Sequence, residues 1–219
     1  MKKTFSVIAT VLLISTLGIC FDRGFYGDNA TNKIFVQKNK IQNGDLIFQI
    51  SLSPQSKAIQ LATQSKYSHC GIVYKNGDQY VVFEAVQPIK STPLEQWIAK
   101  GKNRHYVVKR LKNSEEILTD SALEKMKIVG AEFKGKNYDS FFEWSDDKIY
   151  CSELIWKIYQ RAVGIEIGEI QQLKDFDLSN PAVKQKLKER YGATIPLNEK
   201  VISPASIFNS NALITVLEK

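Results

Sequence analysis

Residues 69–86 read HCGIVYKNGDQYVVFEAV and form the clearest structural pattern in the chain. Two β-rich runs flank Asn76-Gly77, a dipeptide that favours the tight two-residue turn of a β-hairpin. If these two residues form the turn, His69 lies opposite Glu84. Side chains directly opposite each other have Cβ atoms about 5 Å apart, which lets a carboxylate bind an imidazole. The hairpin therefore predicts a His69–Glu84 pair, whereas a three-residue turn would place His69 opposite Ala85.

Alternation along the same strand places Cys70 on the opposite face from His69. That face also carries Ile72, Val81 and Phe83. Cys70 is therefore predicted to be a small buried core residue. Because neighbours on a strand point in opposite directions, we expect Cys151 to contact His69 and to lie away from Cys70. A disulfide between the two cysteines is the alternative, since paired cysteines are common outside the cytoplasm.

Cys151 begins a second pattern, within KIYCSELIWKIY (148–159). Apolar residues then recur at helical spacing, at Leu154, Ile155, Ile158 and Ala162. This spacing predicts an amphipathic helix that packs on the sheet and begins near Cys151. The N–H groups and dipole at a helix N-terminus favour an anion, and so lower the pKa of a thiol from about 8.5. Cys151 is thus a candidate nucleophile, with His69 as its base and Glu84 orienting the base. A buried structural cysteine is the alternative.

Other elements follow from turn and capping signals. Strands are predicted at 44–50, 105–111 and in ALITVL (212–217), and helices at 53–64, 114–133 and 179–192. Ser53 and Pro54 would begin the first helix, and Asn180, Pro181 and Gly192 would bound the last. Strands and helices do not alternate strictly, which indicates an α+β fold with an antiparallel sheet packed against helices.

The N-terminus has the pattern of a secretory signal. Lys2 and Lys3 precede the apolar stretch FSVIATVLLISTLGICF, which predicts a signal peptide or membrane anchor over residues 1–20. LGIC resembles a lipoprotein cleavage box, although Ile19 stands where a small residue is usual before Cys20. A linker over 21–41 and one domain over 42–219 would follow. We therefore expect an extracytoplasmic, periplasmic protein, attached to the membrane if the segment is retained or lipidated.

Composition narrows the function classes. The 219 residues are 43% hydrophobic and 24% charged, as in ordinary globular proteins. The net charge of +7 is spread out, with no run of five basic residues and no nucleic-acid-binding motif, so no nucleic-acid partner is expected. The sequence has no CxxC or HxxxH spacing, and a Cys/His/Glu set falls short of a closed zinc site. We expect no metal and no cofactor.

Four stretches together resemble one known family: NGDLIFQISLSPQSKAIQLATQSKYSHCGIV, FEAVQPIKSTPLEQWI, GKNYDSFFEWSDDKIYCSE and KDFDLSNPAVKQKLKERYG. They are similar to the YaeF/YiiX-like family of permuted papain-like enzymes in the NlpC/P60 superfamily. The similarity extends over nearly all of the predicted domain. Papain has its residues in the order Cys, His, Asn, whereas His69 and Glu84 precede Cys151 here, as a circular permutation requires.

The resemblance implies a circularly permuted papain-like fold and a cysteine amidase or acyl hydrolase. The family also has a tyrosine just upstream of the cysteine, which Tyr138 in GKNYD matches best. Its phenol would donate a hydrogen bond to the oxyanion. Tyr150 and Tyr67 are rival candidates for this role.

The resemblance further implies a hydrophobic pocket for the acyl side of the substrate. The candidate lining residues are Phe141, Phe142 and Trp144, and plain core packing is the alternative for each of them. The expected substrate is a small molecule, a lipid or a cell-wall peptide. Two functions remain as alternatives: a D,L-endopeptidase acting on cell-wall peptides, and a catalytically silent envelope-binding domain.

Overall fold

The structure is a computed structural model that describes residues 40–219. The predicted signal segment and residues 21–39 of the predicted linker lie outside these residues. Ile41, at the end of that linker, is buried in the apolar interior. None of the helices formed by residues 40–219 has the length and apolar character that a membrane span requires.

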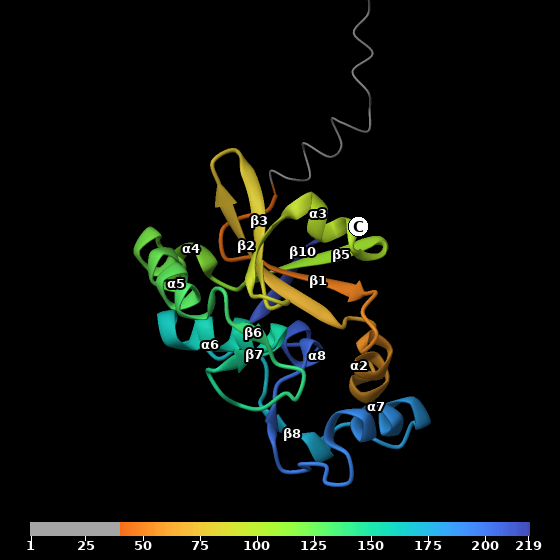
Figure 1. Cartoon of the computed structure of the whole chain (residues 1–219). Coiled ribbons are helices and arrows are strands. Elements are labelled where there is room, and N and C mark those ends of the chain that lie inside the picture. Colours follow the sequence, from red (N-terminus) through yellow and green to blue (C-terminus); the bar gives the residue numbers. More distant parts are fainter. Residues whose placement is uncertain (1–39) are drawn as a thin grey trace, which may run out of the picture.

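A six-stranded antiparallel sheet forms the centre of the molecule, with the strand order β10-β5-β1-β2-β3-β4 (Figure 1). Its strands are β1 (Leu46–Ser51), β2 (His69–Asn76), β3 (Gln79–Glu84), β4 (Lys90–Pro93), β5 (Gly101–Leu111) and β10 (Leu213–Glu218). Two short pairs lie apart from this sheet: parallel β6 (Asn137–Tyr138) and β7 (Lys148–Ile149), and antiparallel β8 (Gln171–Gln172) and β9 (Lys200–Val201).

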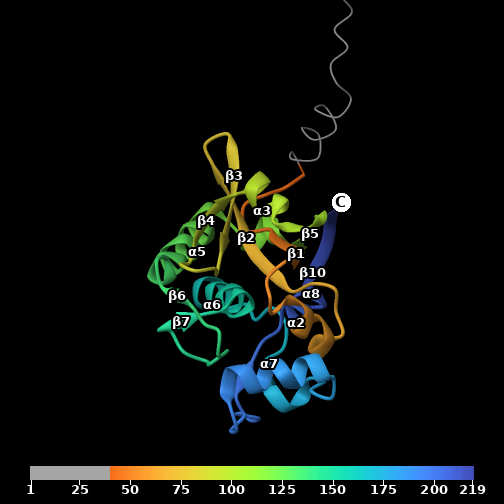
Figure 2. The same cartoon turned by 45° about the vertical axis from the view of Figure 1, so that its right-hand side comes forward.

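Helices cover both faces of the sheet. They are α2 (Ser56–Thr63), α3 (Leu94–Ala99), α4 (Ser114–Ile117), α5 (Asp120–Phe133), α6 (Cys151–Val163), α7 (Pro181–Tyr191) and α8 (Pro204–Phe208), with a 3-10 turn at Leu173–Asp175. In Figure 1, α5 and α6 lie on one side of the sheet and α3 lies on the other. Figure 2 shows α2 next to α7 at the end of the molecule beneath the sheet. The expected α+β fold is confirmed.

Strand alternation divides the apolar interior into two clusters. Phe48 and Ile72 face α6, where they pack in one cluster with Ile155. Ile47 and Val73 point the other way and pack with Trp97 of α3. The sheet therefore carries apolar side chains on both faces. Helix α6 packs in the larger of the two clusters.

Capping residues explain several element boundaries. α6 ends at Gly164, whose φ of 73° is the left-handed conformation that glycine adopts without steric cost. The Asn180 side chain accepts a hydrogen bond from the N–H of Ala182 and caps α7, as predicted. The strand predicted in ALITVL is β10, which lies at one edge of the sheet.

Two predicted helices differ from those observed. The predicted 114–133 helix is two helices, because the Thr119 hydroxyl accepts a hydrogen bond from the N–H of Ala122 and begins α5 anew. The predicted start at Ser53 and Pro54 is also wrong. Those residues form a turn, and α2 begins at Ser56.

Candidate active site

The hairpin turn differs by one residue from the predicted one. Asn76 pairs with Gln79, so Gly77 and Asp78 form the loop, and Gly77 takes the left-handed conformation with φ of 60°. Continued along the strands, this register places Gly71 opposite Glu84, and a Cβ added to Gly71 would lie 3.4 Å from the Glu84 Cβ. The prediction that His69 lies directly opposite Glu84 is therefore wrong.

His69 and Glu84 nevertheless make contact. Moving the turn by one residue shifts the pairing of the two strands by two residues, an even number that leaves every side chain on its predicted face. His69 and Glu84 therefore become diagonal neighbours. Because Gly71 places no side chain between them, His69 Nε2 lies 2.5 Å from Glu84 Oε2. Nδ1 is the ring nitrogen that remains available for another partner.

The Glu84 carboxylate is buried and has two partners. Besides His69, it accepts a 2.6 Å hydrogen bond on Oε1 from the Thr92 hydroxyl. Burial alone would raise the pKa of Glu84, but the contacts with His69 and then Thr92 lower it below its ordinary value. The His69 ring also stacks on Trp97, with centroids 5.9 Å apart. Glu84 is thus an ionised group that holds the imidazole in a fixed orientation.

Cys151 is the first residue of α6 and is buried. A hydrogen bond from the Cys70 thiol lowers the pKa of Cys151 well below its ordinary value, and the hydrogen bond and positive charge of His69 lower it further against the opposing effect of burial. Burial also opposes protonation of His69, but Cys151 and Glu84 together raise the pKa of His69 to about 10. Cys151 and His69 therefore form a thiolate–imidazolium pair.

The position of Cys70 corrects one expectation. Cys70 is a buried core residue and no disulfide joins it to Cys151, but it does not lie away from Cys151. Its thiol and its backbone N–H both act on Cys151 and lower the pKa of Cys151. In the middle of a strand, the side chains of two consecutive residues point to opposite faces of the sheet and cannot both contact the same atom. His69 and Cys70 begin β2, and at this strand end the backbone of Cys70 and the side chains of both residues reach the same atom.

Tyr138 lies beside Cys151. It lines the same cleft as Cys151, and its hydroxyl oxygen accepts a 2.9 Å hydrogen bond from Gln55 Nε2. Burial and the negative charge of Cys151 raise the pKa of Tyr138, so the phenol keeps its proton. The rivals are engaged differently: the Tyr150 hydroxyl accepts from the N–H of Ile202, and Tyr67 stacks on Phe208.

An apolar cleft opens next to Cys151, between α2, α7 and the first turn of α6. Its lining includes Ala58, Ile59, Leu173, Phe176, Val183 and Leu187. Of the three aromatic residues proposed from the sequence, Phe142 lines this cleft. Phe141 is 42% exposed, and Trp144 packs against Trp156 with ring centroids 5.3 Å apart. The prediction that Phe141 and Trp144 line the pocket is therefore wrong.

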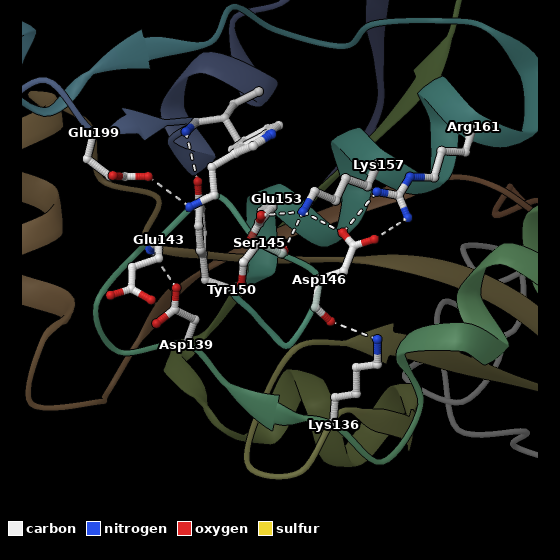
Figure 3. Close-up of polar contacts among 12 residues, drawn as sticks. Lys136, Asp139, Glu143, Ser145, Asp146, Tyr150, Glu153, Lys157, Arg161 and Glu199 are labelled. Atoms are coloured by element: carbon white, nitrogen blue, oxygen red, sulfur yellow. Dashed lines mark hydrogen bonds and ion pairs between the residues drawn. The ribbon is translucent and has the colours of Figure 1, made fainter.

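A network of charged side chains, buried at Lys157 and Glu153 and half-exposed at Asp146, fixes the segment between β6 and β7, which precedes Cys151 (Figure 3). Lys157 Nζ on α6 lies 2.7 Å from Glu153 Oε1, as an ion pair rather than an aligned hydrogen bond, and 2.8 Å from Asp146 Oδ1. Arg161 also donates to Asp146, and Asp139 accepts hydrogen bonds from backbone N–H groups of its own loop. The loop that carries Phe142 is therefore anchored to α6, the helix that begins at Cys151.

A thiolate at a helix N-terminus, paired with an imidazole on an antiparallel sheet, places the protein among the cysteine hydrolases of papain-like fold. Residues 40–217 match the family of permuted papain-like amidases described as YaeF/YiiX, C92 family, and the chain belongs to this family. It is 51% identical over 178 residues to the uncharacterized protein YiiX of Escherichia coli (strain K12), covering 81% of this chain and 87% of that protein.

A solved structure is also similar, the crystal structure of metalloprotein yiiX from Escherichia coli O157:H7. It aligns with a TM-score of 0.78 at 52% sequence identity, covering 82% of this chain and 98% of that chain. The expected enzyme class, a cysteine hydrolase of the permuted papain type, is confirmed by the family.

Sequence reasoning missed three residues around this site. Thr92 lies on β4, a short strand without an alternating pattern, and Trp97 lies on the six-residue helix α3. Gln55 immediately precedes α2, within the range predicted as a helix. None of the three carries a chemical signal of its own, and tertiary contacts alone identify them.

Proposed function

We propose that Cys151, His69 and Glu84 form the catalytic triad of an extracytoplasmic amidase or acyl hydrolase. The observation that carries this proposal is the continuous chain of contacts from the Cys151 sulfur through His69 to the buried Glu84 carboxylate. The lowered pKa values of Cys151 and Glu84 and the raised pKa of His69 support the states that these roles need, a thiolate, an ionised carboxylate and an imidazolium.

In the proposed reaction, the Cys151 thiolate attacks the carbonyl carbon of an amide or ester. The tetrahedral oxyanion accepts hydrogen bonds from N–H groups at the start of α6 and from the Tyr138 phenol. The His69 imidazolium then protonates the leaving nitrogen or oxygen, and the carbon–nitrogen or carbon–oxygen bond breaks, leaving an acyl thioester on Cys151. Water next attacks the thioester while His69 takes its proton, which releases the acid and restores the thiolate.

The apolar lining of the cleft supports an acyl chain as the group that binds next to Cys151. Ala58, Ile59, Val183 and Leu187 give the cleft an apolar wall that suits an acyl chain, while Gln55, Lys186 and Arg190 are polar or charged residues in the same lining. We therefore propose acyl-amide or lipid-like substrates ahead of cell-wall peptides. The N-terminal signal pattern supports the extracytoplasmic location.

The similar protein from Escherichia coli O157:H7 is described as a metalloprotein. Within residues 40–219 of the present chain, no group of three or more His, Cys, Asp or Glu side chains is arranged to hold a metal ion. The described residues therefore do not fit a resident metal, and we assign no step to one.

The proposal can be tested with five variants assayed on N-acyl-lysine, phospholipid and muropeptide. Cys151→Ala and His69→Ala should each nearly abolish turnover without unfolding the protein, and Glu84→Gln should keep more activity because the base survives. His105→Ala is the matched control, since the other described histidine lies outside the site on β5. Equal activity of Cys151→Ser and the wild type would contradict the thiol mechanism.

A further inference from the structure

Gln55 connects the candidate site to helix α7. Its side-chain Nε2 donates a 2.9 Å hydrogen bond to the Tyr138 hydroxyl oxygen, and its Oε1 accepts a 3.0 Å hydrogen bond from Arg190 Nη2. All three residues line the cleft that contains Cys151. A single chain of hydrogen bonds therefore runs from α7 through Gln55 to the phenol.

Arg190 determines which way the Gln55 amide points. An arginine side chain can only donate hydrogen bonds, so the Gln55 atom that it binds has to be the carbonyl oxygen. The amide nitrogen is then left to face Tyr138. Arg190 is itself held in place, because its guanidinium lies 4.2 Å from the centroid of the Phe142 ring.

The Gln55 amide in turn determines what the phenol can do. A tyrosine hydroxyl has one proton to donate and can also accept a hydrogen bond. Because the Tyr138 oxygen accepts from Gln55, the phenol proton is not used in this contact. It is free to point into the cleft, which is where a substrate carbonyl would lie next to Cys151.

We propose that Gln55 is a positioning residue that directs the Tyr138 phenol proton toward the substrate oxyanion, and that Arg190 fixes the amide orientation required for this. The inference rests on the proposed role of Tyr138 and adds the residues that determine the direction in which the phenol donates its proton. It predicts that the direction of the Gln55–Tyr138 hydrogen bond, and not merely its presence, controls the rate.

The decisive comparison is Gln55→Glu with Gln55→Ala. A glutamate has nearly the same shape and still pairs with Arg190, but its carboxylate can only accept, so it draws the phenol proton away from the substrate. Loss of one oxyanion donor lowers kcat by roughly 100- to 1,000-fold, and we expect Gln55→Glu to approach the loss seen for Tyr138→Phe. Gln55→Ala leaves the phenol free to turn, and should cost about tenfold in kcat. KM should change little in either variant.

A purely structural role gives the opposite order, since the isosteric glutamate would then be the milder change. The assay is p-nitrophenol release from p-nitrophenyl octanoate, with the burst reporting acylation and the steady state reporting kcat. Gln79→Glu is the control, because it places the same charge at the exposed hairpin tip. Adding Gln55→Ala to Tyr138→Phe should cause no further loss, since Gln55 acts only through the phenol.

The outcomes separate the two proposals. The positioning role is wrong if Gln55→Glu is at least as active as Gln55→Ala, if Gln55→Ala still costs tenfold in the Tyr138→Phe background, or if Tyr138→Phe has full activity. In each of these cases a burst that requires Cys151 would leave the proposed hydrolase standing. A wild-type protein that releases no p-nitrophenol in a Cys151-dependent way, in the burst or in the steady state, would contradict the proposed function itself.

Discussion

Replacing Gly71 with alanine tests how closely the two strands approach at the His69–Glu84 pair. The added Cβ would lie 2.4 Å from Val82 Cγ1 and 2.9 Å from the Phe83 carbonyl oxygen. Because the carbonyl belongs to the backbone, a change of rotamer cannot relieve that contact, and β2 and β3 have to separate. Overpacking of this kind costs about 1–3 kcal/mol of unfolding free energy. At about 2–4 °C per kcal/mol for a chain of this size, Tm should fall by about 2–12 °C.

The same separation should reduce activity beyond the effect on stability. Moving β3 away lengthens the 2.5 Å contact between His69 and Glu84, and a 1 Å misplacement can cost about 100-fold in rate. We expect kcat to fall by roughly 10- to 100-fold when measured at 25 °C, where the variant is still folded.

Gly77→Ala is the matched control, in the turn of the same hairpin. Its φ of 60° makes alanine costly by about 1–2 kcal/mol, but a Cβ there meets nothing within 4 Å. Tm should therefore fall while kcat stays at the wild-type value. The reasoning would be refuted if Gly71→Ala kept wild-type Tm and kcat, or if Gly77→Ala lost as much activity.

Three further predictions concern the thiolate, its base and the cleft. The thiolate–imidazolium pair exists between the lowered pKa of Cys151 and the raised pKa of His69, so kcat/KM should fall above a pH of about 10 as His69 loses its proton. Glu84→Gln removes the negative charge that favours the imidazolium, so the fall in kcat/KM should begin at a pH lower by about one unit or more. An unchanged pH profile would contradict the effect of Glu84 on His69. Cys70→Ala removes the strongest influence that lowers the pKa of Cys151, so alkylation of Cys151 by iodoacetamide at pH 6 should slow. Lengthening an N-acyl-lysine by two methylenes should raise kcat/KM roughly tenfold, at about 0.8 kcal/mol per buried methylene, and Phe142→Ala should weaken this dependence. A flat response to chain length with rapid muropeptide cleavage would favour the cell-wall peptidase instead.

The face of the sheet on which a side chain lies can be predicted from the sequence even where the exact pairing of the strands cannot. The predicted Asn76-Gly77 turn lies one residue before the observed one, but moving a two-residue loop by one position changes the sum of paired residue numbers by two. His69 and Glu84 therefore stay on one face, as strand alternation requires. Cys151 is equally predictable, because the apolar spacing after it specifies where the helix begins.

The remaining contacts depend on tertiary geometry that local patterns do not contain. Cys70 lies on the same face as Ile72, which faces α6, so alternation itself brings Cys70 to Cys151. His69 lies on the opposite face, against Trp97, and reaches Cys151 because it is the first residue of β2. Phe141, Phe142 and Trp144 share one aromatic stretch, yet the loop turns sharply at Phe142, whose φ is 55°, and only Phe142 lines the cleft. An irregular loop has no period from which to infer the direction of its side chains.

The central claim is that Cys151 becomes acylated, and mass spectrometry of the trapped enzyme tests it most directly. The protein is mixed with p-nitrophenyl octanoate, quenched in acid during the p-nitrophenol burst, and digested. Our account predicts one octanoyl group per chain, held as a thioester on the peptide that contains Cys151, and its loss in Cys151→Ala and His69→Ala. A burst with no octanoyl group on Cys151, or with the group on another side chain, would contradict it.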